Sequence, residues 1–589
     1  MQLNTGHQTT QQLLLSLENC THLGARFTSR TGQDDFFPYA DVLQRARRAA
    51  AFYQKEGIQP GDRVAILLPT GIEFFDAFLG AILAGAIPAA LYPPFRLGKL
   101  EEYFERTRQM LRRIEARMVV TDDQAGKLLG RAVTDVRSVK RAIQARELTS
   151  GTGWRPVEAI PDEPVFLQFS SGSTREPKAV VVTHRNLLCN LEMMASSLRK
   201  IPDMDPVAGG VCWLPLYHDM GLVGCLFNGL HYPGTVTYLR PDDFVVRPSL
   251  WLQTLSRTRA QVSPAPHFAY RLCVSKIKNS EMDGVDLSHW RMALNGAEPI
   301  DTEGLQAFTR RFERWGFRPE AMTPVYGLAE AGLAVSFGTP LEPPRIVGFD
   351  RDELSAHGRV VPNGTKMLAA VGSPLPGLTV TIRGEDGNSA PPDRVGRITV
   401  HGPSITPGYY NDPGLTSEML RNGWLDTGDL GFLHGGELFI VGRAKDLIII
   451  RGRNYAPQEI EELVWDLPGV REGCVVAVSH LLENQGEQLI IFAEKDKKHP
   501  VPEEELVTAI RDRVIAALPM SPYLVQMLDP GTLPRTSSGK LRRADALRLY
   551  LDNKLVPPGS VTSLKLFLEL GKSQLAWGRF RVGSWSQEK

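Results

Sequence analysis

The chain has 589 residues, which is too long for a single hydrophobic core and indicates several folded units. Hydrophobic residues make up 42% and charged residues 23%, an ordinary globular composition that excludes a disordered or fibrous protein. Lysine and arginine total 67 against 66 aspartates and glutamates, and this net charge of +1 argues against a dedicated nucleic-acid binder. The six cysteines form no CxxC pair, so the sequence supports neither a zinc site nor a disulfide framework.

The N-terminal residues, MQLNTGHQTTQQ, lack a basic region followed by an apolar stretch, which predicts that no signal peptide is present. The longest uncharged apolar run, residues 77–92, is shorter than the roughly 18 residues that a membrane span needs. Because it also contains Gly80, Gly85 and Pro88, we interpret it as a buried helix. These features predict a soluble, cytoplasmic protein without a membrane span.

The first two-thirds of the chain alternates short β-rich runs with helical patterns. The predicted strands are Arg63–Leu68, Met118–Thr121, Ala179–Val182, Thr235–Leu239 and Met292–Leu294, and an apolar helix at Glu73–Leu83 follows the first of them. Strands that alternate with helices favour βαβ units and mainly parallel sheets. Active sites in such α/β folds gather at the loops beyond the strand ends.

From about Pro374 the pattern changes to shorter strands separated by turns, which predicts a β-rich subdomain. A small α+β unit follows, with predicted helices beginning at Pro457 and around Leu506, Ile510 and Val514, and predicted strands at Cys474–Val478 and Gln488–Ala493. We therefore expect a large domain over residues 1–442, a hinge over residues 443–446 that includes Asp446, and a small mobile domain over residues 447–556. Residues 557–589 form a tail to which no structure is assigned.

The strongest local motif is LQFSSGSTREPKAVVVTH, residues 167–184. A predicted strand leads into a turn of small and hydroxylated residues: Ser170, Ser171, Gly172, Ser173 and Thr174. Backbone N–H groups and hydroxyls in such a loop can hold phosphate oxygens, and a glycine lets the backbone approach closely. The motif differs from the GxxxxGK[ST] nucleotide loop. Taken alone, it is more often an ordinary polar turn.

Five further blocks follow this loop in order. They are Asn295–Pro299, which can present backbone groups to a purine edge; Tyr326–Glu330, with an aromatic face and a carboxylate; Asp426–Asp429, with carboxylates suited to a ribose diol; Gly442–Asp446, with an arginine; and Pro534–Lys540, with a lysine in a flexible loop. Each block alone could be a turn or a solvated patch. All five in this order are very unlikely to occur by chance.

Together these blocks, over residues 39–547, resemble the core motifs of the adenylate-forming superfamily, which includes acyl-CoA synthetases, luciferases and peptide-synthetase adenylation domains. Three segments resemble the fatty acyl-AMP ligases more closely: WLPLYHDMGL (Trp213–Leu222), SPAPHFAY (Ser263–Tyr270) and RGRNYAPQEIE (Arg451–Glu461). A polar segment over residues 346–367 is similar to the insertion that marks this subfamily. The resemblance implies an enzyme that joins a fatty acid to ATP, releases pyrophosphate and passes the acyl group to an acyl carrier protein.

The resemblance also implies roles for individual residues, with ATP and Mg²⁺ as cofactors. Lys540 would supply positive charge between the carboxylate and the α-phosphate, and His218 would donate a hydrogen bond nearby. The implied ATP and AMP ligands are Ser170, Ser171, Gly172, Ser173, Thr174, Gly296, Ala297, Glu298, Tyr326, Gly327, Asp429 and Arg443. Glu330 and Thr174 would hold Mg²⁺. Met220, Gly221, Leu222 and Phe268 would line the acyl pocket. The sequence departs from the family pattern at Arg175 and Ala179, where glycine is usual, and at His267, where asparagine is usual.

Two alternatives stay open on the sequence alone: an acyl-CoA synthetase of the same fold, and a catalytically silent protein that binds nucleotide or acyl-adenylate. The insertion favours the ligase, because Asp350, Asp352 and Glu353 make a poor surface for an anionic nucleotide cofactor. The RGRNYAPQEIE segment favours it as well. A basic group near the lysine, formed by Arg535, Lys540, Arg542, Arg543 and Arg548, could attract an acidic carrier protein, or these arginines could be solvated or bind ATP.

Overall fold

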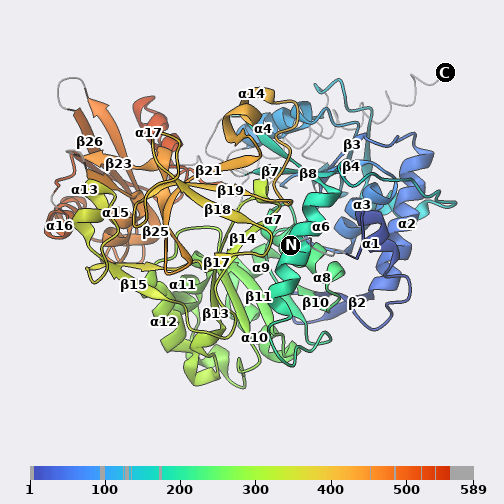
Figure 1. Cartoon of the computed structure of the whole chain (residues 1–589), viewed down its shortest axis with the longest axis horizontal. Coiled ribbons are helices and arrows are strands. Elements are labelled where there is room, and N and C mark those ends of the chain that lie inside the picture. The colour runs from blue at the N-terminus through green and yellow to red at the C-terminus, as the bar shows by residue number, and fades with distance from the viewer. Residues whose placement is uncertain are drawn as a thin grey trace.

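The computed structural model describes residues 6–92, 100–123, 125–126, 132–133, 135–170, 176–450, 453–482, 486–518, 520–536 and 539–557. Four of the predicted phosphate-loop residues, Ser171, Gly172, Ser173 and Thr174, lie outside these ranges, as does the tail beyond residue 557. The described residues form a large domain and a small one, and the small domain is drawn in orange and red at the left of Figure 1. The predicted α/β class, with parallel sheets and β-rich regions, is confirmed.

The first sheet of the large domain has six strands in the order β6-β5-β3-β4-β7-β8, and all neighbours run parallel except β7 and β8. Its strands are β3 (Arg63–Leu67), β4 (Ile87–Ala90), β5 (Met118–Thr121), β6 (Arg141–Gln144), β7 (Pro164–Ser170) and β8 (Lys178–Thr183), and the accompanying helices are α2 (Tyr39–Lys55), α3 (Ile72–Leu83) and α4 (Leu100–Arg113). Most residues of β3 and β5 are apolar and buried because both faces of a parallel sheet are covered. The predictions for β3, α3 and β5 are thus confirmed.

The apolar run at residues 77–92 was predicted to be one buried helix, and that prediction is wrong in its second half. The helix ends after Leu83, Gly85 adopts a φ of +76°, and the chain continues as β4. Inside α3, Gly80 lets α2 approach closely, because a Cβ there would lie 2.4 Å from the Cβ of Ala49. Among the described residues, no helix is long and apolar enough to cross a bilayer.

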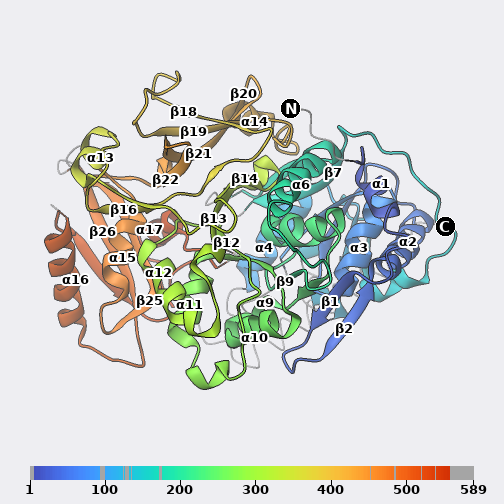
Figure 2. The same ribbon diagram turned by 60° about the horizontal axis from the view of Figure 1, so that its bottom comes forward.

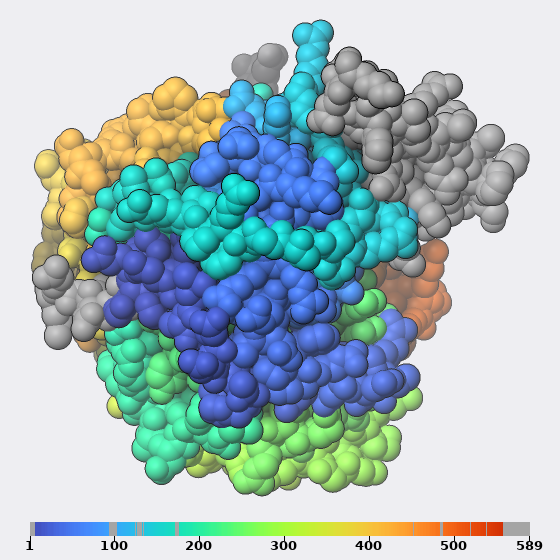
Figure 3. Space-filling view, turned by 90° about the vertical axis from the view of Figure 1, so that its right-hand side faces the viewer, coloured from blue at the N-terminus to red at the C-terminus, as the bar shows by residue number. Residues whose placement is uncertain are grey.

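The second sheet has nine strands in the order β17-β14-β13-β12-β11-β9-β10-β1-β2, and its central pairs from β13 to β1 are parallel. Its strands are β1 (Gly24–Thr28), β2 (Asp34–Pro38), β9 (Gly210–Cys212), β10 (Val236–Tyr238), β11 (Val262–Pro266), β12 (Met292–Gly296), β13 (Met322–Gly327), β14 (Ala334–Phe337) and β17 (Ser373–Pro374). The helices around it are α1 (Thr10–Leu15), α6 (His184–Leu198), α7 (Asp219–Gly221), the π-helix η3 (Leu222–Phe227), α8 (Asn228–His231), α9 (Pro241–Val246), α10 (Ser249–Thr258), α11 (His267–Lys276) and α12 (Thr302–Phe312). Figure 3 looks onto the face that the N-terminal segments, in blue and cyan, cover.

The β-rich subdomain predicted after Pro374 forms a five-stranded antiparallel sheet. It contains β18 (Thr379–Arg383), β19 (Gly396–His401), β20 (Leu420–Arg421), β21 (Trp424–His434) and β22 (Glu437–Arg443), with helix α14 (Pro413–Met419). The predicted insertion at residues 346–367 is not a loop throughout. It folds into β15 (Ile346–Phe349), α13 (Arg351–His357) and the start of β16 (Lys366–Ala369), and it packs Phe349 and Leu354 into a small core of its own with Phe432 and Phe439.

The small domain follows the short 3₁₀ turn η8 (Ala444–Asp446). Its elements are β23 (Ile448–Ile450), β24 (Arg453–Tyr455), α15 (Pro457–Trp465), β25 (Val470–Leu482), β26 (Gly486–Lys495), α16 (Glu503–Ala517), β27 (Leu524–Leu528) and α17 (Arg543–Leu551). The predicted helix that begins at Pro457 and the predicted strands near residues 474–478 and 488–493 are confirmed. A separate core formed by residues of α15, α16 and the sheet indicates that this unit folds around its own apolar centre.

Helix α1 is tied to α6 through a buried histidine. The backbone N–H of Thr10 donates to Nδ1 of His184 over 3.1 Å, which requires an unprotonated nitrogen. Burial lowers the pKa of His184 to about 4. Because the unfolded chain takes up this proton nearer pH 6.5, stability should be complete above that pH and decline as the pH falls towards 4, by about 3 kcal/mol. Urea unfolding at pH values from 7 to 4.5 measures this loss of stability. The variant His184→Gln should lose less stability over the same range. An equal loss in the variant would contradict the assignment of the effect to His184.

Candidate active site

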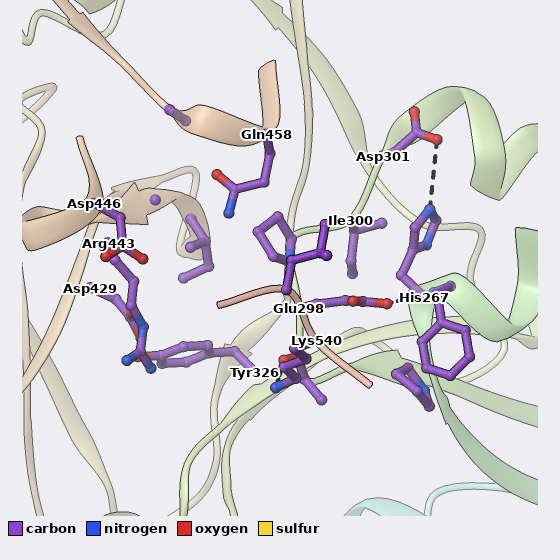
Figure 4. Close-up of a pocket in the computed structure, with 18 of the residues that line it drawn as sticks. His267, Glu298, Ile300, Asp301, Tyr326, Asp429, Arg443, Asp446, Gln458 and Lys540 are labelled. Atoms are coloured by element: carbon purple, nitrogen blue, oxygen red, sulfur yellow. Dashed lines mark hydrogen bonds and ion pairs between the residues drawn. The ribbon is translucent and has the colours of Figure 1, made fainter. Parts of the chain in front are cut away.

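A cavity of about 2640 Å³ lies between the large and small domains and is lined by residues of both. It collects most of the residues predicted for the site: Ser170, His218, Met220, Phe268, Ala297, Glu298, Tyr326, Gly327, Glu330, Asp429, Arg443, Asp446 and Lys540. Figure 4 shows several of these side chains converging from both domains. Gly296 does not line the cavity. It packs so tightly against β13 that a Cβ there would lie 2.7 Å from Val325.

One corner of the cavity holds a tyrosine, an aspartate and an arginine from three strands. The hydroxyl of Tyr326 donates to Oδ2 of Asp429 over 2.7 Å, and Nε of Arg443 lies 3.0 Å from Oδ1 of the same carboxylate. Asp429 and Arg443 are cross-strand partners in β21 and β22, so the register of the hairpin fixes the pair. The carboxylate, only 7% exposed, is therefore held in place by two donors, as a group that receives ribose hydroxyls would need to be.

Lys540 reaches this corner from the small domain. Its Nζ donates to the backbone carbonyl of Ala297, at the end of β12 in the large domain. Ala297 has a φ of +65°, an uncommon conformation for a residue with a Cβ, and such strain is concentrated at functional sites. Burial lowers the pKa of Lys540, while the carboxylates of Glu298 and Asp219 act in the opposite direction. The lysine predicted from the PRTSSGK motif thus lies in the cavity with both domains closed around it.

His218 and Asp219 form a pair beside the lysine. Nδ1 of His218 lies 2.6 Å from Oδ1 of Asp219, at the start of α7. Burial opposes ionisation of Asp219, but the neighbouring His218 and Lys540 hold its pKa below the ordinary value. This corner therefore combines a fixed imidazole with a carboxylate that stays ionised.

Glu330 lies in the short 3₁₀ turn after β13 and is 9% exposed. The hydroxyl of Tyr409 donates to its Oε1 over 2.7 Å, and burial raises the pKa of the carboxyl above its ordinary value. Within the described parts of the chain, no three ligating side chains gather into a metal site. A single oriented carboxylate fits a Mg²⁺ ion that takes most of its ligands from phosphates and water. The other predicted metal ligand, Thr174, lies outside the described residues.

His267, the departure from the usual asparagine, has a structural task. The Nδ2 of Asn295 in β12 lies 3.1 Å from Nδ1 of the imidazole, and Nε2 lies 3.7 Å from Asp301, the N-cap of α12. Figure 4 marks the contact between His267 and Asp301. Burial acts to raise the pKa of Asp301, but His267 and Arg271 hold it at about 2. His267 therefore links β12 to the next helix, α12.

Two of the residues predicted for the acyl pocket do not line the cavity. Leu222 is 1% exposed and packs into the main core, and Gly221 lies so close to the preceding turn that a Cβ would come within 2.4 Å of the carbonyl of Pro215. The residues that do line the apolar part, besides Met220 and Phe268, were not predicted: Met194, Leu198, Gly224, Val262, Leu294, Val325, Leu333 and Phe337. Side chains along β11 and β12 alternate between the two faces of the sheet, and this alternation is the sequence signal that could have identified some of them.

The basic residues near Lys540 are engaged within the small domain. Arg543 pairs with Glu461 and Arg542 with Asp545, each over 2.6 Å, and Arg548 lies 3.3 Å from Asp545. Arg543 is also largely covered, with 18% of its side chain exposed. Neighbouring carboxylates therefore offset the charge of these three arginines, whereas Arg535 donates to the carbonyls of Gly539 and Gly473.

The insertion contacts the small domain through ion pairs between side chains. Arg453 of β24 pairs with Asp352, Lys366 Nζ lies 3.0 Å from Glu459, and Arg351 Nε lies 3.5 Å from the same carboxylate. Arg351 also donates to the carbonyl of Ala517 at the end of α16 over 3.2 Å. The insertion at residues 346–367 thus contacts the small domain directly.

Comparisons with known proteins agree with this geometry. The family described as AMP-binding enzyme matches residues 24–410. Long-chain-fatty-acid–AMP ligase FadD26 of Mycobacterium marinum is 34% identical over 541 residues, which cover 87% of this chain and 91% of that protein. Medium-chain-fatty-acid–[acyl-carrier-protein] ligase JamA of Moorena producens is 33% identical over 541 residues, covering 88% and 90%.

The fold is also similar to solved structures. One comes from a study of fatty acyl-adenylate ligases from E. coli and L. pneumophila; it has a TM-score of 0.87 and 33% identity, and the match covers 93% of this chain and 99% of that one. The family match spans more than half of the sequence and includes the strands that carry Ala297 and Tyr326. The chain therefore belongs to the AMP-binding enzyme family.

Proposed function

We propose that this chain is an ATP-dependent enzyme that activates a fatty acid as its acyl-adenylate and releases pyrophosphate. The observation that carries the proposal is the position of Lys540, which reaches Ala297 from the other domain. It lies in one cavity with the Tyr326–Asp429–Arg443 cluster and with an apolar branch. These are the three parts that the reaction needs: a cation, a nucleoside site and room for an alkyl chain.

The reaction joins two anions. A carboxylate oxygen attacks the α-phosphorus, the bond between the α- and β-phosphates breaks, and pyrophosphate leaves with its electron pair. Two unit charges about 4 Å apart repel by about 4 kcal/mol at an effective dielectric constant near 20. Lys540 offsets this repulsion as a compact positive charge, and His218 can donate a hydrogen bond beside it. Tyr326, Asp429 and Arg443 hold the nucleoside, so catalysis consists of positioning and electrostatic stabilisation.

Mg²⁺ would be held by Glu330 together with phosphate oxygens of ATP. Burial raises the pKa of this carboxyl, and a nearby cation would favour its ionised form. When bound, the ion would neutralise charge on the departing pyrophosphate. The Tyr409 hydroxyl holds this carboxylate in one orientation.

We further propose that the acyl group passes to an acyl carrier protein. The ion pairs of Asp352, Lys366 and Arg351 with the small domain support this choice, because the insertion is the feature that distinguishes the ligases from acyl-CoA synthetases in the resembling subfamily. The relative JamA carries an acyl-carrier-protein ligase name. The rival acceptor is free coenzyme A.

The purified chain with decanoate, ATP and Mg²⁺ should accumulate decanoyl-AMP and catalyse decanoate-dependent exchange of labelled pyrophosphate into ATP. A carrier protein bearing phosphopantetheine should then consume the adenylate, whereas free coenzyme A should leave it unchanged. Apo-carrier protein, which lacks the thiol, is the matched control. Saturable formation of decanoyl-CoA would overturn the choice of acceptor, and failure of every fatty acid to support exchange would overturn adenylation itself.

A further inference from the structure

An apolar hollow leads from the point where Lys540 meets Ala297 into the large domain. One wall is a face of the nine-stranded sheet, where Val262 pairs with Met292 and Pro264 with Leu294. Directly paired residues and every second residue share a face of a sheet. The face therefore continues across β13 and β14. Its cavity-lining members are Val262, Pro264, Pro266, Leu294, Val325 and Phe337.

The exposure pattern of β12 shows that this face borders open space. Leu294 is only half-buried, although β12 lies at the centre of the sheet, whereas its neighbours Ala293 and Asn295 are both 0% exposed. Interiors of proteins are close-packed, so a central-strand leucine is normally covered by a helix. Leu294 and its neighbours across the sheet instead face a space that an apolar ligand can fill.

Two helical segments form the opposite walls. Met194 and Leu198, four residues apart on α6, line the hollow, and Figures 1 and 2 both place α6 beside β14. The other wall is formed by Met220, Gly224 and Asn228, spaced by four residues along α7, η3 and α8. Gly224 lies in the π-helix, a rare form that is frequently found at functional sites. A Cβ on Gly224 would meet only Leu333, at 3.1 Å, so these two residues form a neck.

The hollow has a floor. Leu198 and Val262 line its far end, where Ile201 and Met292, the strand partner of Val262, are 3% and 0% exposed in the same apolar cluster. Pro266 at the reactive end and Val262 at the deep end are four residues apart on one strand, which is about 13 Å. A saturated chain with carbon–carbon bonds of about 1.5 Å advances roughly 1.3 Å per carbon. The space therefore accommodates about ten carbons.

We propose that this hollow makes the enzyme selective for medium-chain fatty acids of about 8 to 12 carbons, with Gly224 and Leu333 as the neck through which the chain must pass. The inference rests on the proposed adenylation of fatty acids. A sixteen-carbon chain would carry several carbons beyond the layer of Ile201 and Met292, where the core is closed. A four-carbon chain would end before the neck and gain none of the apolar contacts below it.

The wild-type enzyme should be assayed by pyrophosphate exchange with saturated acids from butanoate to octadecanoate. We expect kcat/KM to rise to a maximum between octanoate and dodecanoate and to be at least tenfold lower for hexadecanoate. Exchange that is highest with hexadecanoate or longer acids would refute the length limit while leaving adenylation intact. Absence of exchange with every acid would instead refute the proposed function, so the two failures can be told apart.

Two substitutions should move the optimum in opposite directions. Gly224→Leu fills the neck, and the ratio of kcat/KM for decanoate to that for butanoate should fall at least tenfold. Val262→Ala deepens the hollow, and the optimum should move by about two carbons towards longer acids. Val211→Ala removes the same two methyl groups from a buried position on β9 that does not line the cavity, and its profile should match wild type. Ratios within one preparation are insensitive to partial unfolding, so unchanged ratios in both lining variants would overturn the proposal.

Discussion

Replacing Lys540 by alanine should lower the rate of acyl-AMP formation by about 100- to 1000-fold, because the lysine is the cation placed where two anions must meet. The effect should appear mainly in kcat. The interaction of Lys540 with the reacting groups strengthens as charge develops in the transition state. In the variant, Tyr326, Asp429 and Arg443 still bind the nucleoside. Pyrophosphate exchange at saturating ATP and fatty acid measures the loss.

Arg548→Ala is the matched control for this variant. It removes another cation of the small domain, one that pairs with Asp545 and Asp552 and does not line the cavity. We expect nearly wild-type exchange from it. Both variants should keep the wild-type melting temperature within a few degrees. Arg548 makes partly exposed ion pairs, which contribute little to stability, and burial already disfavours the charged form of Lys540, so that the fold loses little when it is removed. A Lys540→Ala enzyme that makes acyl-AMP at the wild-type rate would remove Lys540 from the mechanism.

Replacing Asp446 by proline should slow the complete reaction at least tenfold with little change in thermal stability. Asp446 ends the 3₁₀ turn η8, and a proline there would fix φ and remove the backbone N–H at the junction. Movement of the small domain away from the closed arrangement would require dihedral changes at the junction, and proline resists them.

The experiment compares single-turnover formation of acyl-AMP with multiple turnover in the presence of the carrier protein. The first should be affected less than the second, because the first uses the closed state. Asp446→Ala, which removes the carboxylate but leaves φ unrestricted, should retain most of the multiple-turnover rate. Wild-type kinetics in the proline variant would place the hinge elsewhere.

The sequence was sufficient to predict the elements with clear periodicity. The strand at Arg63–Leu67 and the small-domain helix at Pro457–Trp465 lie where they were expected, because their patterns and boundaries agree. The motif residues that carry charge or an aromatic ring, such as Lys540 and Asp429, also meet in one cavity although 111 positions separate them in the chain. Motif order reveals which residues act together, whatever the path of the chain between them.

Other features depend on tertiary structure and left no local signal. Residues 84–92 are as apolar as the helix before them. The helix ends because Gly85 adopts a positive φ, and the residues after it form a strand. The walls of the hollow consist of ordinary aliphatic residues such as Leu294, which differ from core residues only in what lies opposite. The sequence suggests a basic patch at the arginines near Lys540, because it does not show which carboxylates lie beside them. Only the fold brings their partners, Glu461 and Asp545, next to them.

Several of the described contacts between the two domains involve charged side chains. Arg271 of α11 lies 5.1 Å from the ring of Trp465 and 3.7 Å from Glu472, and the insertion adds its own pairs with Arg453 and Glu459. Breaking contacts between charged side chains exposes little apolar surface, so it changes the heat capacity very little. Salt screens such partly exposed pairs strongly. The balance between closed and open forms should therefore respond to ionic strength far more than to temperature, which gives a way to populate the open form without denaturing either domain.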